Sequence, residues 1–277
     1  MTATRPKIGL ALSGGGTRGL VHIGVLSVLV KAGIPIDYVA GTSVGSFVGA
    51  VFCAGMPVDQ MRALALSTSW KLLSRPALSH SALLSFRPLE TWVEQILGDV
   101  DICDLGIPFA VITADLERGE KVVLRRGPVA RAVHASCAIP GIVEPVEIDG
   151  RLLCDGGIVD NLPIHVVRDM GADYVIGADI FVPSHYHRMG PLGTGLMTIE
   201  TLVRHSGGHV GEADCLITPQ ISGHAYHRFS KAQEFFHLGE DATRRALPTI
   251  KAALSVSSIQ YPVSSVQYPP AKLNTDY

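Results

Sequence analysis

The sequence predicts an α/β fold in which a parallel sheet lies in a layered core, and three observations support this. Two short apolar segments, residues 7–12 and 36–40, are typical of buried strands, and each precedes a helical segment, at 20–32 and 44–54. A glycine ends each helix, and a proline lies two residues further on. The first helix is apolar nearly all round, which is typical of a helix buried in such a core. This strand–helix–strand–helix order gives parallel strands joined by right-handed crossovers.

The rest of the chain is expected to extend this sheet and to cover it. Further strands are expected at residues 108–115, 143–148, 151–154, 174–180 and 215–219. Further helices are expected at 129–137, 162–170 and 231–254, the last interrupted near Gly239 and Pro248. The Asp149-Gly150 pair between two of the strands predicts a tight β-hairpin. A long loop with a helix near residues 197–204 is expected over 181–212, which is rich in Gly, Pro and His.

Residues 58–98 have a mixed composition that predicts irregular helical structure. Tryptophan, leucine and phenylalanine alternate there with serine, arginine and proline. Two interpretations are open. The segment is either an ordinary packed part of the domain, which we favour, or a lid over an apolar substrate.

We expect one large domain at residues 1–254 and a tail at 255–277. No polar linker divides residues 7–254, and a hydrophobic content of 47% is enough for a sizeable core. The tail carries two copies of a Ser-x-Gln-Tyr-Pro sequence, three prolines and few charges. It is expected to be extended or disordered and to carry no chemistry.

Composition and charge exclude several classes of function. The formal net charge of −2 argues against nucleic-acid binding, which needs a basic surface. No apolar run reaches the ~18 residues that span a bilayer, and the N-terminal apolar segment is too short for a signal peptide. We therefore expect a cytoplasmic protein. Its oligomeric state stays open.

The cysteines and histidines do not form a metal motif. The five cysteines contain no Cys-x-x-Cys pair and lie mostly in apolar runs, which predicts reduced core thiols. His185 and His187 are two residues apart but lack a third ligand. We expect neither a metal nor a cofactor.

The segment around Ser43 has the pattern of a nucleophile elbow. Gly41-x-Ser43-x-Gly45 lies between an expected strand and an expected helix, as the motif requires. The serine of such an elbow sits at a sharp, strained turn, so its neighbours must be small. Ser43 is therefore our candidate nucleophile.

The glycine-rich loop at residues 13–19 permits two interpretations. Its backbone N–H groups, free of side chains at Gly14, Gly15 and Gly16, can point into a concavity at a helix N-terminus and hold an oxyanion. The spacing of Gly14, Gly16 and Gly19 also fits a dinucleotide fingerprint. That fingerprint needs an acidic residue at the end of the next strand, whereas Asp37 lies at its beginning. We favour the oxyanion interpretation.

The base that activates Ser43 is less apparent. None of the eleven histidines lies in a distinctive motif. The late ones expected in α/β-hydrolase order are His205, His209, His224, His227 and His237. Asp155 is the alternative, because it ends an expected strand and the glycines behind it allow its carboxylate to approach another loop closely.

Together the segments 14–19, 41–45 and Asp155-Gly156-Gly157 resemble the three signatures of patatin-like phospholipases, in particular the bacterial members related to neuropathy target esterase. Ala135-Ser136, Pro140 and the Asp160-Asn161-x-Pro163 segment also look like the family. The resemblance covers about residues 7–254, and three separate motifs agree.

The resemblance implies a three-layer sandwich of a mostly parallel sheet between helices and a Ser43–Asp155 dyad without histidine. Asp155 would accept the serine proton and later activate water, and partial burial beside Leu152 and Leu153 would raise its pKa and basicity. The N–H groups of Gly15 and Gly16 would form the oxyanion hole. Arg18 would either meet a lipid phosphate or brace the loop through an ion pair.

Two functions follow from these patterns. The first is hydrolysis of a lipid carboxyl ester, with at most transient contact with a membrane surface; a peptide or thioester substrate is a less favoured variant. The second is a non-catalytic protein that holds an acyl chain or a nucleotide in the same glycine-rich cleft.

Overall fold

A mixed α/β sandwich is the fold of this chain, as predicted. The structure is a computed structural model that describes residues 5–77, 82–182, 190–206, 210–221 and 231–256. The described residues form an eight-stranded sheet in the order β10-β9-β1-β2-β5-β8-β7, with β6 also paired to β5. The strands from β10 to β5 pair in parallel, whereas β6, β7 and β8 are antiparallel to their neighbours.

The strands of this sheet are β1 (Ile8–Leu12), β2 (Tyr38–Thr42), β5 (Phe109–Asp115), β6 (Glu120–Leu124), β7 (Val146–Ile148), β8 (Arg151–Asp155), β9 (Tyr174–Ala178) and β10 (Cys215–Ile217). The α-helices are α1 (Val21–Lys31), α2 (Val44–Cys53), α3 (Val58–Ser67), α4 (Trp70–Leu73), α5 (Arg87–Leu97), α6 (Val129–Ser136), α7 (Ile164–Asp169), α8 (Gly190–Ser206) and α9 (Ala232–Val256). Two-residue strands β3 (Arg75–Pro76) and β4 (Leu84–Ser85) pair with each other, and short 3-10 turns include η1 (Gly16–Leu20) and η3 (Gly156–Ile158).

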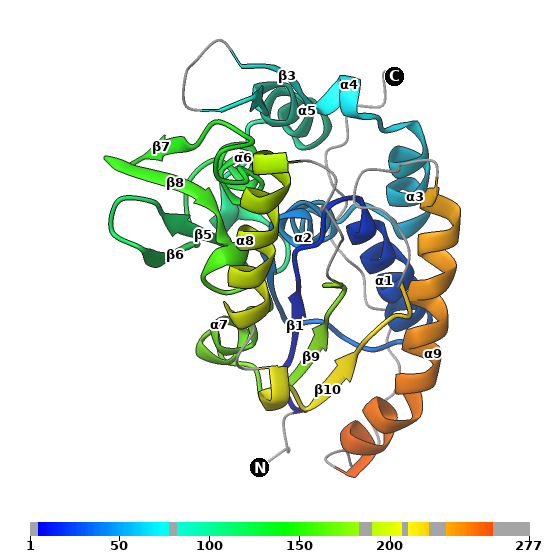
Figure 1. Cartoon of the computed structure of the whole chain (residues 1–277). Coiled ribbons are helices and arrows are strands. Elements are labelled where there is room, and N and C mark those ends of the chain that lie inside the picture. The colour runs from blue at the N-terminus through cyan, green and yellow to red at the C-terminus, as the bar shows by residue number, and fades with distance from the viewer. Residues whose placement is uncertain (1–4, 78–81, 183–189, 207–209, 222–230, 257–277) are drawn as a thin grey trace.

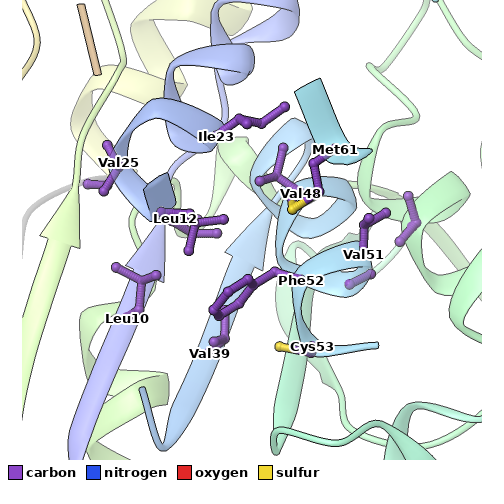
Figure 2. Close-up of a cluster of buried hydrophobic side chains, with 14 of the residues drawn as sticks. Leu10, Leu12, Ile23, Val25, Val39, Val48, Val51, Phe52, Cys53 and Met61 are labelled. Carbon is purple, nitrogen blue, oxygen red and sulfur yellow. The ribbon is translucent and has the colours of Figure 1, made fainter. Parts of the chain in front are cut away.

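Helices cover both faces of the sheet, because side chains of a strand alternate between its faces. On β1, Leu10 and Leu12 pack with α1, α2 and α9 in the larger hydrophobic cluster. Figure 2 shows these two leucines facing Val25 of α1 and Phe52 of α2. On the other face, Ala11 belongs to a second cluster formed with α7. The result is three layers, with the sheet in the middle.

The long helix α9 corrects one prediction. It runs from Ala232 to Val256 without the interruptions expected near Gly239 and Pro248. The reason is tertiary: α9 lies along α1 (Figure 1), and a Cβ on Gly239 would lie 2.1 Å from the carbonyl oxygen of Val21. Gly239 is therefore a close-packing site within the helix and not its end.

Other departures from prediction are smaller. Strand β6 was not predicted, because its first two residues, Glu120 and Lys121, are charged and exposed and the other three are only partly buried. Helix α8 is longer than the expected segment 197–204. The hairpin prediction is correct, since Asp149 and Gly150 have the positive φ angles of a tight turn, 50° and 70°. The tail from residue 257 and the His185-x-His187 pair lie outside the described residues.

The contact between α1 and α9 leads to a stability prediction. On α1, a Cβ at Gly24 would lie 2.1 Å from the Phe236 carbonyl oxygen, so Gly24→Ala forces the two backbones apart. We expect it to lower the free energy of unfolding by about 1–3 kcal/mol despite alanine's better helix propensity.

Chemical denaturation measures this change. The matched control is Gly195→Ala on α8, where the added Cβ meets nothing within 4 Å. That variant should be as stable as the parent protein or up to about 1 kcal/mol more stable. Equal stability of the two variants would contradict the proposed packing of α1 against α9.

Candidate active site

Two strand ends meet beside β5 and create the site. β2 pairs in parallel with the first half of β5, as far as Thr42 opposite Ile112. β8 pairs antiparallel with the second half and ends with Asp155 opposite Thr113. β6 occupies the other edge of β5 over the same residues. β2 and β8 therefore share one edge, and their C-terminal ends point toward each other.

Ser43 follows the end of β2 directly and has a strained backbone. Its φ of 52° and ψ of −127° are unfavourable for a residue with a side chain, as expected of a nucleophile elbow. The turn is possible only because its neighbours are glycines. A Cβ on Gly41 would lie 2.4 Å from the Gly45 carbonyl oxygen, and one on Gly45 would lie 2.4 Å from the Leu12 carbonyl oxygen.

The side chains of Ser43 and Asp155 are in direct contact. The Ser43 hydroxyl donates a hydrogen bond of 2.7 Å to Oδ2 of Asp155. The other carboxylate oxygen accepts the Gly157 N–H at 2.8 Å, and the Asp155 N–H donates to the Ala138 carbonyl at 2.9 Å. These bonds fix both oxygens of the carboxylate, and they direct one of them at the serine.

The Asp155 carboxyl is buried, with only 8% of the residue exposed. Burial raises its pKa from the usual 3.8 to about 6, although the hydrogen bonds from Ser43 and Gly157 oppose this rise. The predicted direction of the pKa shift is therefore correct. Such a carboxylate is a stronger base than an exposed one and is still ionised at neutral pH.

The glycine-rich loop lies against Ser43. A Cβ on Gly14 would lie 3.1 Å from the Cβ of Ser43, and one on Gly19 would lie 2.2 Å from Cγ2 of Val44. Within the part of the chain that the structure describes, the N–H groups of Gly15 and Gly16 have no hydrogen-bond acceptor. Two free donors therefore lie in the loop that contacts the serine.

Ser136 is a buried positioning residue that the sequence analysis did not single out for a role. Its hydroxyl oxygen accepts the backbone N–H of Ser43 at 2.8 Å, and the hydroxyl donates to the Ile112 carbonyl at 2.6 Å. The N–H of the elbow is thereby attached to β5. In the sequence, the only signal for this role of Ser136 is its place in the segment before Asp155.

The segment after Asp155 fixes the other two motifs. Asn161 is buried, and its Oδ1 accepts the Gly14 N–H at 3.2 Å. The Thr42 hydroxyl donates to the backbone carbonyl of Asp160 at 2.9 Å. Residues 160–161 therefore connect the glycine-rich loop to the end of β2.

The side chain of Arg18 is buried and donates a hydrogen bond to the Val182 carbonyl. Of its two suggested roles, this contact favours the bracing of the loop over contact with a lipid phosphate. His22 is also buried and also hydrogen-bonds a backbone carbonyl beside the glycine-rich loop. Its Nε2–H donates to the Ser13 carbonyl at 2.9 Å, and burial lowers its pKa to about 4, so it is neutral.

Among the described residues, no histidine hydrogen-bonds Ser43 or Asp155. His134 pairs with Glu90 at 2.6 Å, and His165 pairs with Glu212 at 3.0 Å. Three of the late histidines considered above, at positions 209, 224 and 227, lie outside the described residues.

A buried thiol also adjoins the site. Burial raises the pKa of the Cys137 thiol, and the charge of Asp155 raises it further. The thiol is therefore protonated at neutral pH, and a protonated thiol is a poor nucleophile.

Two further ligand classes have no support in the described residues. Asp37, considered for a ribose, is bound by Arg5 at 2.7 Å and by the Ile8 N–H at 2.8 Å, before the start of β2 and away from the elbow. No group of three or more His, Cys, Asp or Glu side chains within the described ranges is placed to hold a metal ion.

The chain is similar to known proteins in sequence and in fold. Residues 10–168 match the family model described as patatin-like phospholipase. An uncharacterized NTE family protein of Mycobacterium tuberculosis is 39% identical over 181 residues, which are 64% of this chain and 50% of that protein. Neuropathy target esterase sws of Drosophila melanogaster is 36% identical over 64% of this chain and 13% of its own length.

A third relative, lysophospholipase nte1 of Aspergillus fumigatus, is 32% identical over 62% of this chain and 12% of its own length. The chain thus spans half or less of the length of these curated relatives. Among solved structures, VipD from Legionella pneumophila has a TM-score of 0.60 at 14% identity, covering 89% of this chain and 67% of that one. ExoU of Pseudomonas aeruginosa, in its complex with SpcU, has a TM-score of 0.51 at 18% identity, over 91% of this chain and 53% of that one. These two show the same fold.

None of the helices in the described residues has the length and apolar character needed to cross a membrane. The family model covers more than half of the chain, and the three motifs that it joins meet at one place in the fold. On this ground the chain belongs to the patatin-like phospholipase family, and its curated relatives include the proteins named for neuropathy target esterase.

Proposed function

We propose that this chain is a serine acyl hydrolase that cleaves lipid carboxyl esters: phospholipids, lysophospholipids or simpler acyl esters. One observation carries the proposal, the 2.7 Å hydrogen bond from the hydroxyl of Ser43, at a strained elbow, to the buried carboxylate of Asp155. The family supports it, as do the names neuropathy target esterase and lysophospholipase among the relatives.

In the first half of the reaction, the Ser43 oxygen attacks the ester carbonyl carbon while Asp155 accepts the hydroxyl proton. The tetrahedral intermediate collapses, the ester C–O bond breaks, and the alcohol leaves with the proton from Asp155. The acyl group stays on Ser43. In the second half, Asp155 takes a proton from water, and the resulting hydroxide attacks the acyl carbon. The fatty acid is released and Ser43 regains its proton.

The oxyanion of each tetrahedral intermediate needs hydrogen-bond donors. The N–H groups of Gly15 and Gly16 are the donors we assign, because they are unpaired among the described residues and their loop contacts Ser43. The Val44 N–H at the start of α2 is a third candidate. One such donor typically contributes ~3 kcal/mol to stabilisation of the transition state.

A dyad without histidine is chemically reasonable here. The catalytic base works best when its pKa lies near the working pH, and burial has moved the pKa of Asp155 toward that range, to about 6. Ser136 holds the backbone of Ser43, and the Gly157 N–H holds the carboxylate of Asp155. These two contacts orient the dyad, so a histidine between the serine and the aspartate is not needed.

The alternative function is a non-catalytic binding protein. Its nucleotide version is not supported, because Asp37 is engaged by Arg5 and Ile8. An acyl-chain-binding protein would use the same cleft but would not need a strained serine. We further propose that residues 1–254 form the functional unit, since all the contacts described at the site lie between Ser13 and Val182.

Removal of either member of the dyad should abolish ester hydrolysis. We expect Ser43→Ala and Asp155→Asn each to lower kcat by about 10³-fold or more, since the two groups act as a unit. A fluorophosphonate should label the parent protein at Ser43 alone, and this labelling should be lost in both variants. Labelled-peptide mapping and turnover of a short-chain ester measure the two effects.

Two surface substitutions serve as matched controls: Ser67→Ala and Asp59→Asn, which change exposed residues of α3 outside the three motifs. Both should retain full activity and labelling. Full activity of Asp155→Asn would refute the dyad, and binding of a fatty acid without any ester turnover or labelling would favour the binding protein.

The pH dependence of catalysis should follow the titration of Asp155. Below its pKa the carboxyl is protonated and cannot accept the Ser43 proton, so activity is lost on the acid side. We expect kcat/KM for an uncharged ester to be half-maximal near pH 6 and to fall about tenfold for each pH unit below that. A profile that stays flat from about pH 5 to about pH 8 would rule out Asp155 as the base.

The buried carboxylate should also lower the stability of the protein at neutral pH. Its pKa is higher in the folded than in the unfolded chain, so folding favours the protonated form, and stability falls as pH rises from about 4 through about 6. At pH about 7.5, the free energy of unfolding of Asp155→Asn should therefore be about 1–3 kcal/mol higher than that of the parent protein.

Denaturant titrations at two pH values test this linkage. At pH about 4 the carboxyl is almost fully protonated in the folded protein and about half protonated in the unfolded chain, so the advantage of Asp155→Asn should be mostly gone. The exposed-residue variant Asp59→Asn is measured beside it as the control. A variant that is equally stable or less stable at both pH values would contradict the assigned cost of burying the charge.

A further inference from the structure

Exposed apolar side chains concentrate in one segment of the chain. Of the seven large hydrophobic residues exposed in the described part of the chain, four lie between residues 66 and 83. They are Leu66, Trp70, Leu72 and Leu83, with exposed fractions of 58%, 36%, 40% and 55%. We call these four residues the cap patch. The other three, Leu116, Leu202 and Leu216, are spread over separate elements.

Basic side chains adjoin the cap patch. Lys71, Arg75 and Arg87 are exposed, and the two arginines line an open pocket of about 420 Å³ together with Leu72 and Trp92. No acidic side chain lines this pocket. The chain as a whole has a net charge of −2, so this positive charge is local.

The charge of Arg87 acts on the carboxylate of Glu90, but the hydrogen bond and ion pairs of Glu90 are with other residues. Glu90 lies one turn further along α5 and pairs with His134 at 2.6 Å and with Arg131 at 3.6 Å. The charge of the two pocket arginines is thus available to an anion from outside the chain.

The cap patch lies at the same end of the molecule as Ser43. Figure 1 shows α3, α4, α5 and β3 beyond the end toward which β1 and β9 point, which is the end where Ser43 follows β2. Trp92 of α5 stacks on Phe47 of α2, four residues after Ser43, at 5.3 Å between ring centroids.

A second connection joins the patch to the dyad. The N–H groups of Leu83 and Leu84 donate to the Ile142 carbonyl, in the turn that follows Ala138. The Ala138 carbonyl accepts the Asp155 N–H. One short segment of chain therefore separates the patch from the catalytic carboxylate.

We propose that the cap patch docks on the surface of a lipid bilayer that contains anionic lipids. Trp70, Leu72 and Leu83 insert among the acyl chains, and Arg75 and Arg87 bind the phosphates of the headgroups. A tryptophan and leucines beside basic residues are the composition of an interfacial membrane contact. This supplies the partner for the lipid hydrolysis proposed above, but docking itself does not require catalysis.

The first test is vesicle binding by the Ser43→Ala protein, which leaves the lipid intact. The chain has two tryptophans, and Trp92 is buried, so a fluorescence change on binding reports Trp70. Vesicles of phosphatidylcholine with about 30% phosphatidylglycerol should shift the emission to the blue, and brominated acyl chains should quench it. Pure phosphatidylcholine vesicles should bind more weakly.

Paired variants in the same background identify the surface. Arg75→Ala and Arg87→Ala should each weaken binding to the anionic vesicles by about fivefold, and the double variant Leu72→Ser/Leu83→Ser should weaken it by at least about tenfold. The matched controls, Leu116→Ser, Leu202→Ser and Arg125→Ala, lie after β5, on α8 and after β6, and they should bind as the parent does.

The same substitutions in the active protein separate docking from catalysis. The variants at Arg75, Arg87 and Leu72/Leu83 should retain turnover of a monomeric, water-soluble ester, which also shows that the site is folded, while losing hydrolysis of lipid in anionic vesicles. The three control variants should retain both activities. If no protein hydrolyses any ester but vesicle binding follows the pattern above, the proposed function fails and the docking surface stands.

Three outcomes would overturn the docking proposal. Cap-patch variants that bind anionic vesicles as tightly as the parent protein would place the contact elsewhere. Absence of binding to anionic vesicles by the parent protein would remove it. A concentration-dependent dimer in light scattering without lipid, abolished by Leu72→Ser/Leu83→Ser, would assign the patch to a second copy of the chain.

Discussion

The site depends on the meeting of β2 and β8 along one edge of β5. Thr42, the last residue of β2, is opposite Ile112, and Asp155, the last residue of β8, is opposite Thr113. Ile112 and Thr113 are consecutive in β5, so Ser43, which follows Thr42, lies next to Asp155. A slip of one residue in either pairing would turn Asp155 to the opposite face of the sheet or carry Ser43 past it. The bonds of Ser136 to Ser43 and to β5 hold this arrangement from outside the sheet.

Burial gives the carboxylate its chemistry and also makes it unfavourable for folding. Only 8% of Asp155 is exposed to water, and the pKa of its carboxyl rises accordingly. An unpaired buried charge would cost far more, but the Ser43 hydroxyl and the Gly157 N–H each donate to one oxygen. The neighbouring Cys137 stays protonated for the same reason of burial. One apolar environment therefore makes the aspartate more basic and keeps the thiol inactive.

The elements around the dyad divide into a rigid scaffold and an exposed cap. On the scaffold, glycines permit backbone contacts that no side chain would allow, as at Gly45 against Leu12 and Gly24 against Phe236. The cap from α3 to α5 instead leaves leucines, Trp70 and arginines exposed beside the site. Exposed apolar side chains lower the solubility of a protein. For a protein whose proposed substrate is a lipid, they also provide a surface that can contact a bilayer near the proposed nucleophile.

The sequence by itself determined the α/β class and most strand and helix positions. It also singled out Ser43 and the glycine motifs as candidates, because strict backbone geometry at an elbow and a tight loop permits few residue types, and it singled out Asp155 through the resemblance to a known family. It did not determine strand β6, the continuity of helix α9 or the hydrogen bonds by which Ser136 and Asn161 hold the site. Nothing local distinguishes a buried serine from an exposed one, and Gly239 is compatible with a helix end or a helix crossing until α1 is placed against it. Only the tertiary structure decided these points, since each depends on a contact between segments far apart in the chain.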